Sequence, residues 1–161
     1  MATLIVFDLN QVFVKTQGKG KYNVRPHLDD FIQSIDRLLC QGDIEIAFWT
    51  SKPEHIGRPI LNSILGDTLF KRALFTWYRD ACTPIVIDDN PYHTRKDLRK
   101  IWAQYPQYTK TNTYLIDDSP TKCADFPDNL IQAPPYLGPR KAPNDQGFYQ
   151  ILKMLENKLK A

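Results

Sequence analysis

Short apolar runs that alternate with amphipathic segments limit the fold of this chain more than any other feature. The run TLIVF at residues 3–7 is continuous and rich in β-branched residues, which is typical of a strand buried on both faces of a parallel sheet. Further predicted strands cover residues 44–50, 73–78, 112–120 and 129–134. Apolar residues at helical spacing predict helices at residues 25–42, from Pro53 onward, at 96–105 and at 146–160. This alternation predicts an α/β fold, a Rossmann-like three-layer sandwich around a mostly parallel central sheet.

The length and the composition fit one soluble domain. A chain of 161 residues can bury a core of its own, and 42% apolar with 24% charged residues is ordinary for a globular protein. We therefore expect a single domain over residues 1–161. No apolar run approaches the roughly 18 residues of a membrane span. The net charge of +3 is too small to argue for direct nucleic-acid binding.

The cysteines indicate a reducing compartment. Cys40, Cys82 and Cys123 are odd in number and far apart, and the chain has no CxxC pair, so a disulfide framework is not expected. The apolar stretch at the N-terminus stops at Asp8, which is too short for a signal peptide. We expect a cytoplasmic or nuclear location.

Polar residues stand where three of the predicted strands end. Asp8 follows the first strand, Thr50 and Ser51 end the second, and Asp117 and Asp118 end the fourth. In α/β folds, reactive groups gather beyond the carboxyl ends of the strands. The alternative is that these residues cap the helices that follow. Three independent strand ends favour a common site.

Six stretches, in this order, carry a resemblance to a known family. They are DLNQV at 8–12, VRPHLDDFI at 24–32, FWTSK at 48–52, KDLRKIW at 96–102, LIDDSP at 115–120 and FPDNLIQAPPY at 126–136. From about residue 3 to 136 the chain resembles the haloacid dehalogenase (HAD) superfamily. Within it, the chain is similar to the NLI-interacting-factor-like branch, which includes small phosphatases of the RNA polymerase II C-terminal domain. KDLRKIW joined to NTYLIDDSP is more similar to plant and protist members than to animal enzymes.

A second acidic pair competes with the one at the fourth strand. VIDDNP at 86–91 copies LIDDSP at 115–120. In the family the lysine motif precedes the acidic motif, and Lys96 lies between the two copies. The resemblance therefore assigns the acidic motif to Asp117 and Asp118, and the first copy is expected to be a turn in a variable insert.

The resemblance implies a phosphatase site that needs Mg²⁺. Asp8 would be the nucleophile that forms an aspartyl-phosphate. The metal would be held by Asp8, Asp118 and the main-chain carbonyl of Asn10, because magnesium prefers oxygen ligands. Asp117 would contact the metal through water or hold Lys96.

The same resemblance supplies the phosphate-binding groups. Thr50 and Ser51 would bind phosphate oxygens, and Lys96 would offset the charge of Asp8 and of the phosphoryl group. Two alternatives stay open from the sequence: Thr50 as a helix cap, and Lys100 in place of Lys96. Arg25 is expected to be structural rather than a phosphate ligand.

Asn10 is the departure from the family pattern. Active members have a second Asp here, which protonates the leaving oxygen and then deprotonates the attacking water. An amide can do neither at neutral pH. Three outcomes are compatible with this change: a phosphatase with reduced turnover, a catalytically inactive pseudophosphatase that binds phosphopeptides, and a scaffold with a relic site. The other motif residues are intact, which favours the first.

The spacing of the motifs leaves no room for a large cap domain. Residues 12–25 can form a hairpin or loop, and residues 77–96 a short insert. An open site suits a phosphorylated protein or peptide better than a small metabolite. The lysines of KTQGKGK at 15–21 would either attract such a partner or be merely solvated.

Overall fold

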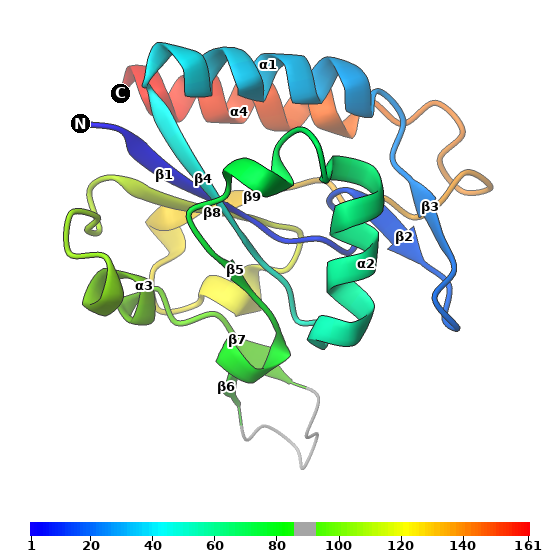
Figure 1. The fold of residues 1–161 in the computed structure, drawn as a ribbon, viewed down its shortest axis with the longest axis horizontal. Coiled ribbons are helices and arrows are strands. Elements are labelled where there is room, and N and C mark those ends of the chain that lie inside the picture. The colour runs from blue at the N-terminus through cyan, green and yellow to red at the C-terminus, as the bar shows by residue number, and fades with distance from the viewer. Residues whose placement is uncertain (86–92) are drawn as a thin grey trace.

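A five-stranded parallel sheet forms the centre of the computed structural model, which describes residues 1–85 and 93–161 (Figure 1). The strand order is β5-β4-β1-β8-β9, and each neighbouring pair is parallel. The strands are β1 (Thr3–Phe7), β4 (Ile44–Trp49), β5 (Thr76–Trp77), β8 (Thr113–Asp117) and β9 (Leu130–Gln132). The predicted α/β class with its parallel sheet is confirmed.

The register of the sheet brings three strand ends to one edge. Phe7, the last residue of β1, pairs with Phe48 on one side and with Ile116 on the other. The residues that follow each strand therefore leave the sheet at the same level, because parallel strands share their direction.

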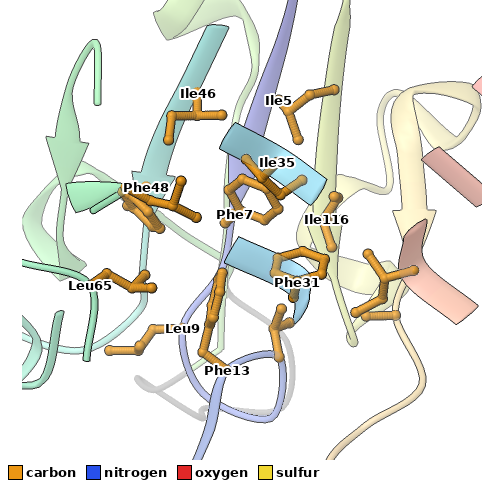
Figure 2. Close-up of a cluster of buried hydrophobic side chains, with 14 of the residues drawn as sticks. Ile5, Phe7, Leu9, Phe13, Phe31, Ile35, Ile46, Phe48, Leu65 and Ile116 are labelled. Atoms are coloured by element: carbon orange, nitrogen blue, oxygen red, sulfur yellow. The ribbon is translucent and has the colours of Figure 1, made fainter. Parts of the chain in front are cut away.

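Three helices cover one face of the sheet. They are α1 (Leu28–Gln41), α2 (Glu54–Leu65) and α4 (Gly147–Lys160), and α1 and α4 lie side by side in Figure 1. The ring of Phe7 lies 5.5–5.9 Å from the rings of Phe13, Phe31 and Phe48. Figure 2 shows these four side chains gathered in one cluster. This aromatic cluster anchors the end of β1, immediately before Asp8.

The opposite face of the sheet packs against a shorter helix and the segments beside it. Leu4 and Val6 alternate with Ile5 and Phe7 along β1 and join a second apolar cluster with Leu98 and Ile101. The helix on this side is α3 (Arg99–Gln104). Because both faces of β1 are buried, its sequence is apolar at each position from Leu4 to Phe7.

Two small antiparallel sheets interrupt the alternation of strands and helices along the chain. β2 (Val14–Thr16) and β3 (Tyr22–Val24) form a hairpin after β1, where a hairpin or loop was predicted. β6 (Thr83–Pro84) and β7 (Thr94–Arg95) pair within the predicted short insert. The acidic copy at 86–91 lies outside the described residues.

Several boundaries differ from the prediction. α3 begins at Arg99 rather than at residue 96, so Lys96 lies in the short connection between β7 and α3. The Lys96 main-chain N–H donates to the carbonyl of Lys122, which ties this connection to η3. β5 keeps two residues of the predicted 73–78, and the short 3-10 turns η1 (Phe70–Arg72) and η2 (Arg79–Ala81) lie just outside the predicted range.

The tail of the fourth predicted strand also differs. β8 ends at Asp117, and the 3-10 turn η3 (Pro120–Cys123) follows, whereas the prediction extended to 120. A further turn, η4 (Pro127–Asn129), leads into β9. Within residues 1–85 and 93–161, no helix has both the length and the apolar character that crossing a membrane requires.

A buried arginine ties the loop after β1 to the C-terminal helix. Arg25 is 1% exposed, and its Nε and Nη2 donate to the carboxylate of Asp145 at 2.6 and 3.1 Å. Its Nη1 donates to the carbonyls of Gln11 and Val12 at 3.3 and 3.2 Å. The structural role expected for Arg25 agrees with these contacts, because the guanidinium is enclosed by protein groups.

Gly147, the first residue of α4, leaves the space that this guanidinium occupies. A Cβ at this position would lie 1.7 Å from Arg25 Nη2. We expect Gly147→Ala to destabilise the fold by about 1–3 kcal/mol, because a methyl group must displace a buried ion pair. Urea unfolding measures this loss. Gln150→Ala on the exposed side of the same helix is the control, and equal stability of the two variants would contradict the packing argument.

Candidate functional site

A cavity of about 220 Å³ lies at the carboxyl edge of the sheet. Six residues predicted from the strand ends and the resemblance line it: Asp8, Asn10, Thr50, Ser51, Asp117 and Asp118. They come from the ends of β1, β4 and β8, which the sheet register places at one level. The convergence of these side chains is therefore a direct consequence of the parallel sheet.

Lys96 lies beneath this cavity and joins two of its acids. Its Nζ donates to Asp8 Oδ1 at 3.0 Å and to Asp117 Oδ2 at 2.7 Å. Lys96 is 2% exposed and Asp117 is 1% exposed. Lys100 is instead exposed, and its Nζ donates to the Ala81 carbonyl. Lys96 is thus the lysine that reaches the acidic residues.

The charges of the site are unbalanced without a further cation. Burial, followed by the negative charge of Asp117, raises the pKa of Asp8 to about 7. The same two causes raise the pKa of Asp118 to about 6. Burial alone would lower the pKa of Lys96, but the charges of Asp117 and Asp8 outweigh it and raise that pKa. One ammonium faces three carboxyl groups, so negative charge is in excess at neutral pH.

The acidic cluster has the chemistry of a divalent-cation site. Oxygen atoms of Asp8, Asp117 and Asp118 lie within 4.8 Å of one another. Asp117 is already engaged, because Oδ2 accepts from Lys96 and Oδ1 accepts the Ser119 N–H at 3.0 Å. Asp8 and Asp118 are therefore the two carboxylates best placed to hold a metal ion such as Mg²⁺, which prefers oxygen ligands.

Asn10 closes the loop that leads into the hairpin. Its Oδ1 accepts from the main-chain N–H of Thr16 at 3.1 Å and from the Thr16 hydroxyl at 3.0 Å. Gln11 beside it adopts a left-handed conformation, with φ of 66°, and its N–H donates to the carbonyl of Val14. The remaining polar atom of the Asn10 side chain is the amide nitrogen, which donates but cannot exchange a proton at neutral pH.

The turn after β4 presents two hydroxyl groups. Thr50 Oγ1 accepts the N–H of Lys52 at 3.1 Å, and the residue that precedes α2 at its N-cap is Pro53. Thr50 therefore closes a turn and does not cap α2, contrary to the capping alternative. Ser51 Oγ is buried and has no hydrogen-bond partner within the described part of the chain.

Sequence reasoning missed several residues that line the cavity. They are Gln11, Lys52, Arg79, Ser119 and Lys122. Arg79 directly follows the predicted strand 73–78, so the strand-end argument applied to Asp8 would have found it. Lys122 lies in η3, and no pattern in the sequence signals its position.

Comparison with known proteins places these residues in a family. The family described as NLI interacting factor-like phosphatase matches residues 3–161. An uncharacterized FCP1 homology domain-containing protein of Schizosaccharomyces pombe is 26% identical over 148 residues, which cover 80% of this chain and 59% of that protein. The chain thus spans less than two thirds of the length of this relative.

Solved structures share the fold at lower identity. The structure of Fcp1, described as an essential RNA polymerase II CTD phosphatase, matches with a TM-score of 0.59 and 17% identity over 98% of this chain and 50% of that one. The cobalt-bound deoxy-D-mannose-octulosonate 8-phosphate phosphatase of Haemophilus influenzae matches with a TM-score of 0.54 and 12% identity, over 99% and 90% of the two chains. At these identities the likeness establishes the fold.

The raised pKa values predict how pH changes metal binding. At about pH 5, Asp8 and Asp118 carry protons for most of the time, because their pKa values lie near 7 and 6. A metal ion must displace these protons. We expect Mg²⁺ at roughly 100 times its Kd to stabilise the fold by about 2–3 kcal/mol near pH 8. The same Mg²⁺ concentration should give clearly less stabilisation near pH 5.

Thermal unfolding with and without Mg²⁺ at the two pH values measures this difference. Without Mg²⁺, the pH dependence of stability has the opposite sign. The folded state binds more protons than the unfolded state between about pH 4 and 7, so the contribution of the cluster to stability falls as pH rises. Asp118→Asn is the control that should lose the response. An equal Mg²⁺ shift at both pH values would contradict metal binding by these carboxylates.

Proposed function

The chain belongs to the NLI interacting factor-like phosphatase family of the HAD superfamily, and from this premise we propose that it is a Mg²⁺-dependent phosphoprotein phosphatase with reduced turnover. The observation that carries the proposal is the cluster of Asp8, Lys96, Asp117 and Asp118 at one edge of the sheet. The matching family and the Fcp1 structure of the same fold are both described as phosphatases, and an acidic cluster with a buried ammonium suits phosphoryl transfer.

Asp8 is the nucleophile in this proposal. One carboxylate oxygen attacks the phosphorus atom, the bond from phosphorus to the ester oxygen breaks, and the phosphoryl group stays on Asp8 as an aspartyl-phosphate. Lys96 holds the other carboxylate oxygen of Asp8 in a fixed direction, since its Nζ donates to Asp8 Oδ1 at 3.0 Å. The Thr50 and Ser51 turn supplies donors to the phosphoryl oxygens.

A bound Mg²⁺ would neutralise the negative charge that the ester and the carboxylates bring together. Asp8, Asp118 and the main-chain carbonyl of Asn10 would hold it, while Asp117 holds Lys96. The Haemophilus influenzae phosphatase that shares this fold is described as a cobalt-bound form, which favours a divalent ion in the proposed mechanism.

Asn10 limits both halves of the reaction. The leaving ester oxygen needs a proton, and the water that later attacks the aspartyl-phosphate must lose one. The Asn10 amide serves neither step, and its oxygen is engaged by Thr16. The loss of general acid-base help typically lowers rates by about 10²–10⁴-fold, or roughly 3–5.5 kcal/mol of barrier.

The size of the cavity supports a protein substrate. At about 220 Å³ it is smaller than the roughly 300–1,000 Å³ of sites that enclose a whole small molecule. It suits one phosphorylated side chain presented by a larger partner. The relative Fcp1 is a phosphatase of the RNA polymerase II CTD, which favours a phosphorylated protein or peptide and a cytoplasmic or nuclear location.

The second candidate is a catalytically inactive pseudophosphatase that binds phosphopeptides or serves as a scaffold. Asn10 is the observation that favours it, because an amide can still donate to a phosphate oxygen. The two candidates share the binding site and differ in turnover alone.

Replacement of the nucleophile separates these candidates. We expect Asp8→Asn to abolish Mg²⁺-dependent hydrolysis of an aryl phosphate, because an amide cannot form the aspartyl-phosphate. Asp67→Asn, an exposed position after α2, is the control that should keep the rate. Equal rates for wild type and Asp8→Asn would end the enzyme proposal. A phosphopeptide that still raises the Tm in Mg²⁺ would then support the pseudophosphatase.

Restoration of a carboxyl group tests the effect of Asn10. We expect Asn10→Asp to raise kcat by about 10²-fold or more for a phosphoserine peptide, because the serine alkoxide needs a proton to leave. For an aryl phosphate, the rate of phosphoryl transfer to Asp8 should rise less, because a phenolate leaves without much help from a proton. A carboxylate oxygen can accept the same Thr16 hydrogen bonds, so the loop should persist.

Steady-state kinetics on both substrates measures this contrast. Asn62→Asp adds the same charge to the exposed side of α2 and serves as the control. An unchanged kcat for Asn10→Asp on phosphoserine would mean that another group already supplies the proton.

A further inference from the structure

We propose that Lys52 and Arg79 form a second anion subsite at the rim of the cavity, which binds a carboxylate side chain next to the phosphorylated residue of the substrate. This inference rests on the proposed phosphatase site and adds a substrate class to it, namely acidic phosphopeptide segments. We call Lys52 and Arg79 the rim pair. Both residues line the cavity that contains Asp8.

Burial separates the rim pair from the residues of the cavity floor. Asp8, Thr50 and Asp117 are 7%, 1% and 1% exposed, whereas Lys52 is half-buried and Arg79 is exposed. A phosphoryl group in reach of the Asp8 carboxylate lies against the floor. In a protein substrate, the rim pair therefore faces the residues that flank the phosphorylated residue.

The turn after β4 fixes the direction of Arg79. Its main-chain N–H donates to the carbonyl of Lys52 at 3.0 Å, and its Nε donates to the carbonyl of Ser51 at 3.0 Å. Among residues 1–85 and 93–161 no hydrogen bond engages the two terminal nitrogens of the guanidinium, and they form the planar fork that matches a carboxylate. Because the side chain is already oriented, binding an anion costs less conformational entropy.

Neither residue of the rim pair has a carboxylate partner in the described part of the chain, in contrast to several arginines on the surface. Arg58 pairs with Glu54, and Arg99 pairs with Asp97. Across residues 1–85 and 93–161, no ion pair joins Lys52 or Arg79 to an acidic side chain. Lys122, a third cation of the cavity wall, is held by the carbonyl and hydroxyl of Thr94, each at 2.9 Å, and is not part of the subsite.

A rival explanation is that the rim pair contacts the phosphoryl group itself. The two explanations differ in what a neighbouring acidic residue contributes. If the rim pair binds the phosphoryl group, its removal weakens all phosphorylated ligands by the same factor. If it binds a second anion, its removal weakens acidic phosphopeptides selectively.

The test compares two phosphoserine peptides that differ in flanking Glu or flanking Gln. Binding is measured by fluorescence anisotropy in Mg²⁺ on the Asp8→Asn background, so that no peptide is consumed and the result does not depend on turnover. We expect the Glu peptide to bind about 10-fold more tightly, since two charge contacts at a partly exposed rim contribute on this scale. Adding Lys52→Met and Arg79→Met should reduce the preference to about 2-fold or less.

A matched control removes two cations elsewhere. Arg37→Met with Lys71→Met deletes the same charge from exposed positions on α1 and η1, and should keep the preference. Equal binding of the two peptides by the protein with an intact rim pair would overturn the proposal. So would an equal loss for both peptides in the Lys52→Met/Arg79→Met variant, or no binding of either peptide. Hydrolysis of an aryl phosphate reports on the proposed function independently of these outcomes.

Discussion

The buried ammonium of Lys96 is the interaction on which the rest of the site depends. An ammonium that is 2% exposed is stable as a charge only with anionic partners, and Asp8 and Asp117 supply them at 3.0 and 2.7 Å. The three residues come from the end of β1, the end of β8 and the segment after β7. Loss of either partner of such a buried pair generally costs about 3–5 kcal/mol. The acids that organise the cavity are therefore also part of what holds these segments together.

A second buried cation fixes the loop between Asp8 and the hairpin. Arg25 donates hydrogen bonds to the carbonyls of Gln11 and Val12, and the carboxylate of Asp145 neutralises its charge. The loop is thus held by Lys96 at Asp8 and by Arg25 at residues 11 and 12. Asn10 lies between these anchors and bonds to Thr16 through an oxygen that either an amide or a carboxylate provides. The fold consequently places no demand on an acid at position 10, and a change there alters chemistry while the loop persists.

The parts of this structure that follow from local pattern could be predicted, and the parts that follow from long-range contacts could not. β1 can be predicted from the sequence because burial of both faces requires a continuous apolar run. The parallel register then places Asp8, Thr50 and Asp117 at one edge of the sheet. The helical spacing of KDLRKIW predicts a helix that begins at Lys96. In the structure Lys96 precedes the helix, and its main-chain N–H donates to the carbonyl of Lys122, which lies 26 positions away in the sequence. Two partners of the Arg25 guanidinium, the Asp145 carboxylate and the Pro134 carbonyl, likewise lie more than a hundred positions away in the sequence.

The distribution of charge in the cavity separates the groups proposed for catalysis from those proposed for substrate binding. The floor holds three acids around one ammonium, and the rim pair holds cations without acidic partners in the described residues. Under the proposed mechanism, the missing acid at position 10 slows the release of phosphate from Asp8 as well as its transfer to Asp8. Contacts at the rim do not involve a proton at either step. If both proposals hold, the change at position 10 lowers turnover while the rim contacts keep their contribution to affinity, so that one site would both bind a phosphorylated partner and hydrolyse it slowly.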